Sequence, residues 1–98
     1  MKKFVLSNQA VSDLRSIALF TQRNWGREQR NVYLKKMDHT FKLLGDNPQL
    51  GVTCDDVAKG YRKFPEGSHL IFYKCAEPLA KILVVRILHK AMDVQQHT

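Results

Sequence analysis

A chain of 98 residues has room for one domain with one hydrophobic core, which excludes a second domain with a cleft between the two. Hydrophobic residues make up 44% of the chain and charged residues 26%, so the sequence is too apolar to be that of a disordered protein. The formal charge of +7 is typical either of a nucleic-acid-binding protein or of a solvated basic surface that maintains solubility.

The positive charge is concentrated in the first half of the chain. Residues 1–45 contain nine Lys or Arg against three acids, whereas residues 46–98 contain seven against six. The excess lies on segments with helical periodicity, where it is either a docking surface for an anionic partner or a solvated helix face.

The cysteines and the longest apolar run indicate the cellular location. Cys54 and Cys75 are too few for a secreted disulfide framework, so we expect free thiols in a reducing cytoplasm. The apolar stretch that follows the two lysines at the start is too short for an export signal. The run at residues 82–88 is interrupted by Arg86 and falls far short of the roughly 20 residues of a membrane span. We therefore predict a cytoplasmic protein without a membrane segment.

The first elements in chain order are a short strand and a helix. Residues 4–6 predict the strand, and Ser7 or Asn8 then offers a side-chain oxygen that caps a helix starting near Gln9. Asp13 lies near the positive end of this helix dipole. The apolar residues that recur at helical spacing are Ala10, Leu14, Ile17, Ala18 and, less regularly, Trp25.

Glycine and proline mark the boundaries of a second helix. Gly26 ends the first helix, and the second begins at Arg27 or Glu28. It ends near Asp46, because the residue before Pro48 is pushed out of helical geometry. Its apolar positions are Tyr33, Leu34, Met37, Phe41 and Leu44. Each helix has one apolar stripe, so the two predict an antiparallel hairpin that packs on a flat surface.

The rest of the chain predicts that surface, a β-sheet. We expect strands at residues 61–64, 69–75 and 81–88, separated by turns at 65–68 and 77–78. The fold class is α+β in the order β-α-α-β-β-β. A two-helix hairpin packs on a small, mostly antiparallel sheet formed by the N-terminal strand and three C-terminal strands.

The last strand is apolar on both faces. Its alternating residues are Ile82, Val84, Arg86 and Leu88 on one face, and Leu83, Val85, Ile87 and His89 on the other. A helical hairpin covers only one face of a sheet. The other face is therefore covered by the C-terminal tail, buried by curling of the sheet, or left as a groove for a partner. Arg86 must either pair with an acid or emerge at the end of the strand.

The sequence contains one set of residues with possible chemistry. The histidines and cysteines lack the spacing of a metal site, and the scattered glycines form no phosphate loop, so we predict no metal and no cofactor. The remaining set combines cations with possible proton donors and consists of Tyr61, Arg62, Lys63, His69, Arg86, His89 and Lys90. It fits either phosphodiester cleavage or a basic strand edge that resists aggregation.

Five segments give the chain a family resemblance: residues 13–17 (DLRSI), 25–26 (WG), 60–64 (GYRKF), 67–73 (GSHLIFY) and 85–89 (VRILH), the last followed by Met92 and Asp93. With the order of the elements, they resemble the ParE branch of the RelE/ParE toxin superfamily. The resemblance implies a single toxin domain over residues 1–98. It also implies the toxic component of a type II toxin-antitoxin system, neutralised by a ParD-like antitoxin protein, with DNA gyrase as its target.

The resemblance implies a binding protein without catalytic residues, with gyrase contacts at Arg62, Lys63, Arg86, His89 and Lys90. The alternative is a ribosome-dependent mRNA endonuclease of the RelE branch, in which arginines stabilise the phosphate and a histidine moves a proton. That branch places an aromatic residue near the C-terminus, and residues 90–98 contain none.

A third hypothesis is a DNA-binding accessory protein that uses Arg23, Arg27 and Arg30 near the helical turn. If the protein is a toxin of this family, we expect no sequence-specific nucleic-acid binding by the toxin alone, because operator binding then belongs chiefly to the antitoxin.

Overall fold

The computed structural model describes residues 3–76 and 81–92. In chain order its elements are β1 (Phe4–Leu6), α1 (Asn8–Trp25), α2 (Arg27–Asp46), the 3-10 helix η1 (Pro48–Leu50), β2 (Val52–Thr53), β3 (Arg62–Glu66), β4 (His69–Ala76), β5 (Lys81–His89) and the 3-10 helix η2 (Lys90–Met92). The strands form one sheet in the order β1-β5-β4-β3-β2. Only the β1–β5 pairing is parallel among these strands. The predicted α+β fold is confirmed.

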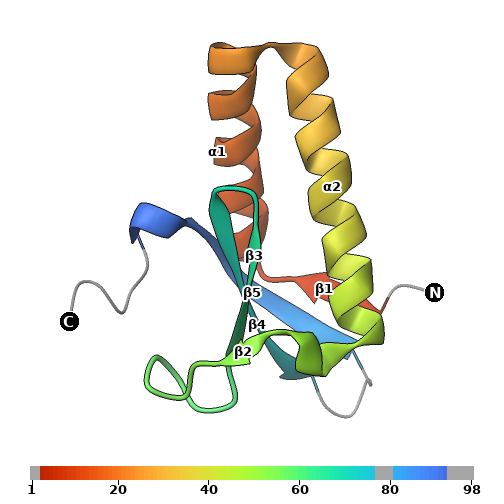
Figure 1. Ribbon diagram of the computed structural model, residues 1–98, viewed down its shortest axis with the longest axis vertical. Helices are drawn as coiled ribbons and strands as arrows, with labels where there is room; N and C mark the ends of the chain where they lie inside the picture. The colour runs from red at the N-terminus through yellow and green to blue at the C-terminus, as the bar shows by residue number, and fades with distance from the viewer. Residues whose placement is uncertain (1–2, 77–80, 93–98) are drawn as a thin grey trace.

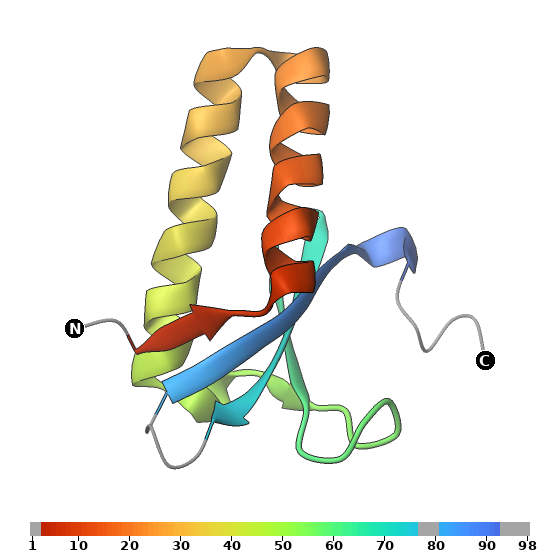
Figure 2. The same ribbon diagram turned by 180° about the vertical axis from the view of Figure 1, so that it is seen from behind.

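The two helices form an upright antiparallel hairpin whose far end extends beyond the sheet (Figures 1 and 2). Gly26 joins them at φ 95°, a left-handed conformation that side-chain-bearing residues rarely adopt. Across the hairpin, Arg30 donates a 2.7 Å hydrogen bond to Gln22. The two helices predicted from the periodicity of apolar residues are confirmed. Ser7 is the N-cap of α1, and its hydroxyl oxygen accepts a hydrogen bond from the N–H of Ala10.

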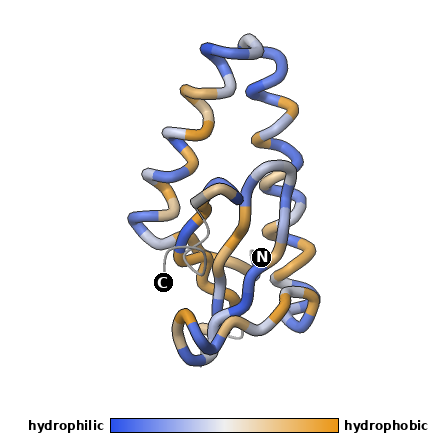
Figure 3. The backbone as a smooth tube through the Cα atoms, turned by 60° about the vertical axis from the view of Figure 1, so that its left-hand side comes forward, coloured by the Kyte–Doolittle hydropathy of each residue, from blue (hydrophilic) through white to orange (hydrophobic). Residues whose placement is uncertain are grey.

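The core lies where the lower half of the hairpin meets the sheet. Its buried residues are Phe4, Ala10, Ile17, Met37, Phe41, Leu44, Ile71, Tyr73, Ile82, Val84 and Ile87. The apolar residues of the hairpin are concentrated in this region, while hydrophilic residues dominate its far end (Figure 3). Trp25 was predicted on the buried stripe and is instead exposed, because the end of α1 extends past the sheet.

The strict alternation predicted for β5 is wrong. The ladder between β4 and β5 shifts register after Phe72, so that Phe72 lies opposite Arg86 and Tyr73 lies opposite Val84. This irregularity adds one residue to β5 and reverses the phase of its second half. Ile87 is consequently buried on the core side with Val84, and not on the opposite face.

The connection between the hairpin and the sheet contains two short elements that the sequence did not predict, η1 and β2. Tyr73 holds this connection in place, because its hydroxyl donates to the carbonyl of Pro48 at 2.7 Å and accepts from the N–H of Gly51 at 2.8 Å. β3 extends to Glu66, so the tight turn is confined to Gly67 and Ser68. The turn predicted at residues 77–78 lies outside the described residues.

Both cysteines are free thiols, with Cys54 buried and Cys75 exposed. Within residues 3–76 and 81–92, no helix is long and apolar enough to cross a membrane.

Candidate functional site

The open edge of β5 is closed by the start of α1. β1 pairs with β5 only as far as Val84, where the N–H of Ser7 donates to the Val84 carbonyl at 2.9 Å. The Ser7 hydroxyl then donates to the carbonyl of Val85 at 2.7 Å, and the Asp13 carboxylate accepts from the N–H of Ile87 at 3.0 Å. Ser7 and Asp13 therefore form hydrogen bonds with the backbone groups of β5 that a neighbouring strand would otherwise bind.

Arg86 pairs with Asp13, as the sequence required of a charge in an apolar strand. Its guanidinium donates to both carboxylate oxygens, at 2.8 and 3.1 Å. The Asp13 side chain is 16% exposed and that of Arg86 39%, so the pair lies at a boundary between core and solvent. The hydrogen bonds that Arg86 donates to Asp13 stabilise the protonated guanidinium and raise the pKa of Arg86 above its ordinary value.

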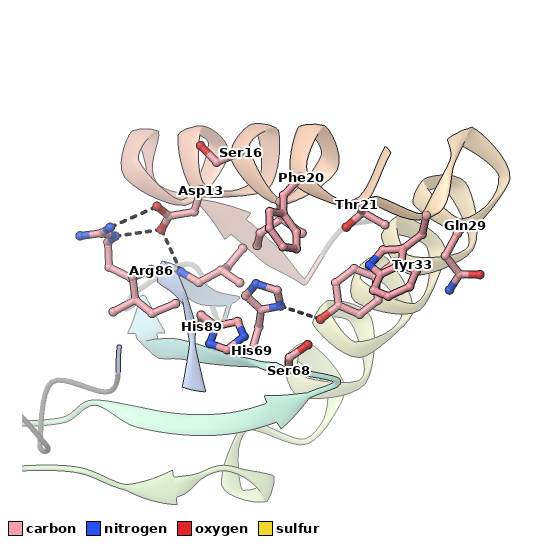
Figure 4. Close-up of a pocket in the computed structure, with 14 residues that line it drawn as sticks. Asp13, Ser16, Phe20, Thr21, Gln29, Tyr33, Ser68, His69, Arg86 and His89 are labelled. Carbon is pink, nitrogen blue, oxygen red and sulfur yellow. Dashed lines mark hydrogen bonds and ion pairs between the residues drawn. The ribbon is translucent and has the colours of Figure 1, made fainter. Parts of the chain in front are cut away.

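A cavity of about 830 Å³ lies between the hairpin and the end of the sheet, where β4 begins and β5 ends. We call it the hairpin groove. It is lined by Asp13, Ser16, Ile17, Phe20, Thr21, Trp25, Gln29, Tyr33, Ser68, His69, Arg86, Ile87, Leu88 and His89. Asp13 and Arg86 lie at one end of the groove, and Tyr33 and Gln29 lie at the other (Figure 4).

The helical wall of the groove carries two exposed aromatic side chains. Phe20 is 64% and Trp25 70% exposed, although both are large hydrophobic residues. Covering such side chains with a partner removes apolar surface from water, at about 25 cal/mol per Å². Large exposed aromatics beside a groove are typical anchor points of protein interfaces.

The floor of the groove is polar and is formed by Tyr33, His69 and His89. The Tyr33 hydroxyl lies 2.7 Å from Nδ1 of His69 and donates to the carbonyl of Glu66 at 2.9 Å. His69 and His89 are opposite each other on β4 and β5, with ring centroids 5.4 Å apart in an edge-on arrangement. The neighbouring Gly67 has no Cβ, which would otherwise meet the Tyr33 ring at 2.8 Å.

Two pKa shifts follow from this packing. Burial lowers the pKa of His69, and the proximity of His89 lowers it further. Burial raises the pKa of Tyr33, and the charge of Glu66 raises it further. Near neutral pH the floor therefore presents an uncharged imidazole and an uncharged phenol.

The structure separates the five predicted contact residues. Arg62 donates to the carbonyl of Gly51 at 2.7 Å, and its strand position is opposite Tyr73 of the core. Lys63 and Arg86 lie on either side of Phe72 in the sheet. Of the five, only Arg86 and His89 line the hairpin groove, and Lys90 follows directly in η2.

Sequence reasoning missed most of the residues of the groove. Phe20 and Trp25 were not recognised as exposed aromatics, and Tyr33 was assigned only to the buried stripe of α2. One signal was present, since Phe20 lies outside the apolar stripe of its helix and yet is large and aromatic. In the described part of the chain, no three His, Cys, Asp or Glu side chains gather where they could hold a metal ion.

The fold is shared with a solved toxin-antitoxin structure. A chain of the chromosomal ParDE TA system from P. aeruginosa superposes with a TM-score of 0.75. The match covers 91% of this chain and 96% of that one, at 16% sequence identity. At this identity the match shows that the two chains share a fold.

Sequence comparisons identify the family. The family model for the ParE toxin of type II toxin-antitoxin system, parDE, matches residues 4–94. Toxin ParE1 of Mycobacterium tuberculosis is 37% identical over 95 residues, covering 97% of this chain and 96% of the relative. Toxin ParE1 of Caulobacter vibrioides is 30% identical over 97 residues, covering 99% and 98%. The chain belongs to the ParE toxin family, which supports the ParE branch over the RelE alternative.

Proposed function

We propose that this protein is the toxin of a type II pair and that an acidic, amphipathic segment of a ParD-like antitoxin neutralises it by lying in the hairpin groove. The observation that carries the proposal is the groove itself, with Phe20 and Trp25 exposed along one wall in a member of the ParE family. The formal charge of +7 favours an acidic partner. A segment that folds on binding covers a large surface with a short chain.

Trp25 provides a direct test, because it is the only tryptophan of the chain and it lines the groove. Titration with the product of the adjacent reading frame, with any tryptophans replaced by phenylalanine, should shift the Trp25 emission to shorter wavelength. Phe20→Ser should weaken binding roughly tenfold or more, the loss expected for an interface anchor.

Leu19→Ser is the matched control for the groove. Leu19 is 55% exposed on the same helix but does not line the groove, so this variant should bind normally. Equal effects of the two serine variants, or an unchanged tryptophan spectrum at saturation, would show that the antitoxin binds elsewhere.

For the toxic activity we propose that the protein acts in the cytoplasm by binding DNA gyrase, without making or breaking a bond itself. The proposed contacts are Arg62, Lys63, Arg86, His89 and Lys90. Lys90 is the best of these for mutation, because it is exposed and lies at the end of β5. Lys90→Ala should weaken inhibition of supercoiling, whereas Lys59→Ala, in the exposed loop before β3, should not.

The gyrase assay also separates the two toxin mechanisms. Purified toxin, gyrase and relaxed plasmid should give reduced supercoiling and an accumulation of cleaved complex. Normal supercoiling together with cleaved transcripts in cells that express the toxin would reject gyrase inhibition and support the ribonuclease mechanism instead.

A further inference from the structure

The hydrogen bonds of the groove floor determine the tautomer of His69. Tyr33 has one hydroxyl proton, and its oxygen lies 2.9 Å from the carbonyl oxygen of Glu66 and 2.7 Å from Nδ1 of His69, with the backbone N–H of Ser68 as a further donor to it. A carbonyl only accepts, so both contacts are satisfied when the hydroxyl donates to Glu66 and the Nδ1–H of His69 donates to the hydroxyl. The neutral ring then carries its lone pair on Nε2.

His89 has the opposite tautomer. Its Nδ1 lies 3.1 Å from the backbone nitrogen of Ala91, whose N–H can only donate, so Nδ1 carries the lone pair and Nε2 carries the proton. The facing imidazoles of His69 and His89 therefore present different groups, one an acceptor and one a donor. Among the described residues, no hydrogen bond to Nε2 of His69 is formed, and in Figure 4 this ring lies between Phe20 and His89.

We propose that Nε2 of His69 is a recognition point in the hairpin groove, which accepts a hydrogen bond from a hydroxyl or amide N–H of the bound antitoxin segment, and that protonation of His69 weakens this binding. The inference rests on the proposed function, because it names the chemistry of the same antitoxin site. A proton on Nε2 converts the acceptor into a donor, so that two donors face each other across the contact. It also places a positive charge in a groove with aromatic and aliphatic walls, where burial of a charge is unfavourable.

The charged and titratable groups around His69 come from five elements. Tyr33 of α2 contacts Nδ1, and His89 of β5 packs against the ring. Glu66 of β3 is opposite His69 in the sheet, and its carboxylate accepts a hydrogen bond from Thr40. Asp13 and Arg86 pair with each other at the far end of the groove. The remaining charge is that of Lys90, whose backbone N–H donates to the carbonyl of Ser68 at 2.9 Å.

These surroundings keep His69 neutral at pH 7. Burial disfavours the imidazolium and the proximity of His89 disfavours it further, so the pKa of His69 is lowered from 6.5. The acceptor is then present at physiological pH and is lost on acidification below pH 6.5.

The test measures antitoxin affinity by calorimetry with the purified toxin between about pH 8 and pH 5.5. Wild-type affinity should fall over this range by up to about tenfold, the limit at pH 5.5 for one linked proton whose pKa does not exceed 6.5. His69→Gln keeps an acceptor and cannot titrate, so the affinity of this variant should not show the loss that protonation of His69 causes in the wild type. His69→Phe keeps a ring without an acceptor and should bind about fivefold or more weakly at pH 8, the loss of one hydrogen bond.

His39→Gln is the matched control, because His39 is an exposed histidine of α2 outside the groove, and this variant should retain the wild-type pH dependence. Circular dichroism at each pH verifies that every variant is folded. Parallel pH curves for the wild type and His69→Gln would overturn the inference and leave the antitoxin proposal intact. If Phe20→Ser also binds normally at pH 8, the docking site itself is wrong and the inference fails with it.

Discussion

Asp13, in the second turn of α1, connects this helix to β5. Its carboxylate accepts three hydrogen bonds, two from Arg86 and one from the backbone of Ile87. Asp13→Ala leaves these donors without their partner and should lower the free energy of unfolding by about 2 kcal/mol, as measured by urea denaturation. Asp38→Asn breaks only the exposed ion pair with Lys42 and should change the free energy of unfolding by less than about 0.5 kcal/mol. Equal losses of stability in the two variants would mean that Asp13 does not hold α1 to β5.

His69 should make the stability of the free toxin depend on pH. Because the folded pKa of His69 lies below the ordinary value of 6.5, the unfolded chain binds more protons than the folded chain in the pH range between the two pKa values. The free energy of unfolding should therefore decrease as the pH is lowered through 6.5 and towards the folded pKa. Chemical denaturation of the wild type and His69→Gln at matched pH isolates this contribution. If the two stabilities change in parallel with pH, His69 is not the responsible group.

The sequence predicted that Arg86 needs a partner, but it could not identify that partner. The two residues of the Asp13–Arg86 pair are 73 positions apart, and they meet only because α1 crosses the free edge of β5. The sequence placed Asp13 near the positive end of its own helix dipole, but the first turn of α1 contains no acidic residue, because the helix begins at Asn8. The role of Asp13 depends on topology, which local patterns do not encode.

The regular elements were predictable from their periodicity, and the irregular ones were not. Both helices have an apolar stripe, and Gly26 and Pro48 mark their ends, so their bounds agree with the structure to within a residue or two. The bulge in β5 leaves no mark on a continuous apolar run, so the side of Ile87 was assigned wrongly. The strand β2 contains only two residues and is too short to show an alternating pattern.

The connection that carries η1 and β2 should depend on a single hydroxyl. Tyr73 is fully buried, and its hydroxyl binds both the Pro48 carbonyl and the Gly51 N–H. Tyr73→Phe leaves both groups without this partner and should cost about 2 kcal/mol. Hydrogen exchange should show the largest loss of protection at Gly51. Tyr61→Phe, at a half-buried ring beside Lys74, is the control. Unchanged protection at Gly51 would contradict the assignment.

At the scale of the whole molecule, the groove results from a mismatch in length between the hairpin and the sheet. The hairpin extends past the sheet, and the outer part of α1 therefore has no strand beneath it (Figures 1 and 2). Phe20 and Trp25 stay exposed for this reason. The sequence predicted a partner surface on the apolar sheet face or along the helical hairpin, and the groove lies between the hairpin and the sheet. The position of the groove depends on how the hairpin and the sheet are arranged in space, which the periodicity of the sequence does not encode.

The positive charge of the whole molecule should accelerate association with an acidic antitoxin. Arg23 and Arg27 are exposed on either side of Trp25, at the far end of the hairpin. The association rate should therefore fall by about tenfold or more as the salt concentration rises from 0.05 to 0.5 M, whereas dissociation should change little. Stopped-flow fluorescence of Trp25 measures both rates. Replacing both arginines by glutamine should reduce the salt dependence. Lys59→Gln should reduce it less, because Lys59 belongs to the loop between β2 and β3, which lies at the opposite end of the molecule from the turn of the hairpin (Figure 1). An association rate independent of salt would show that net charge does not steer this encounter.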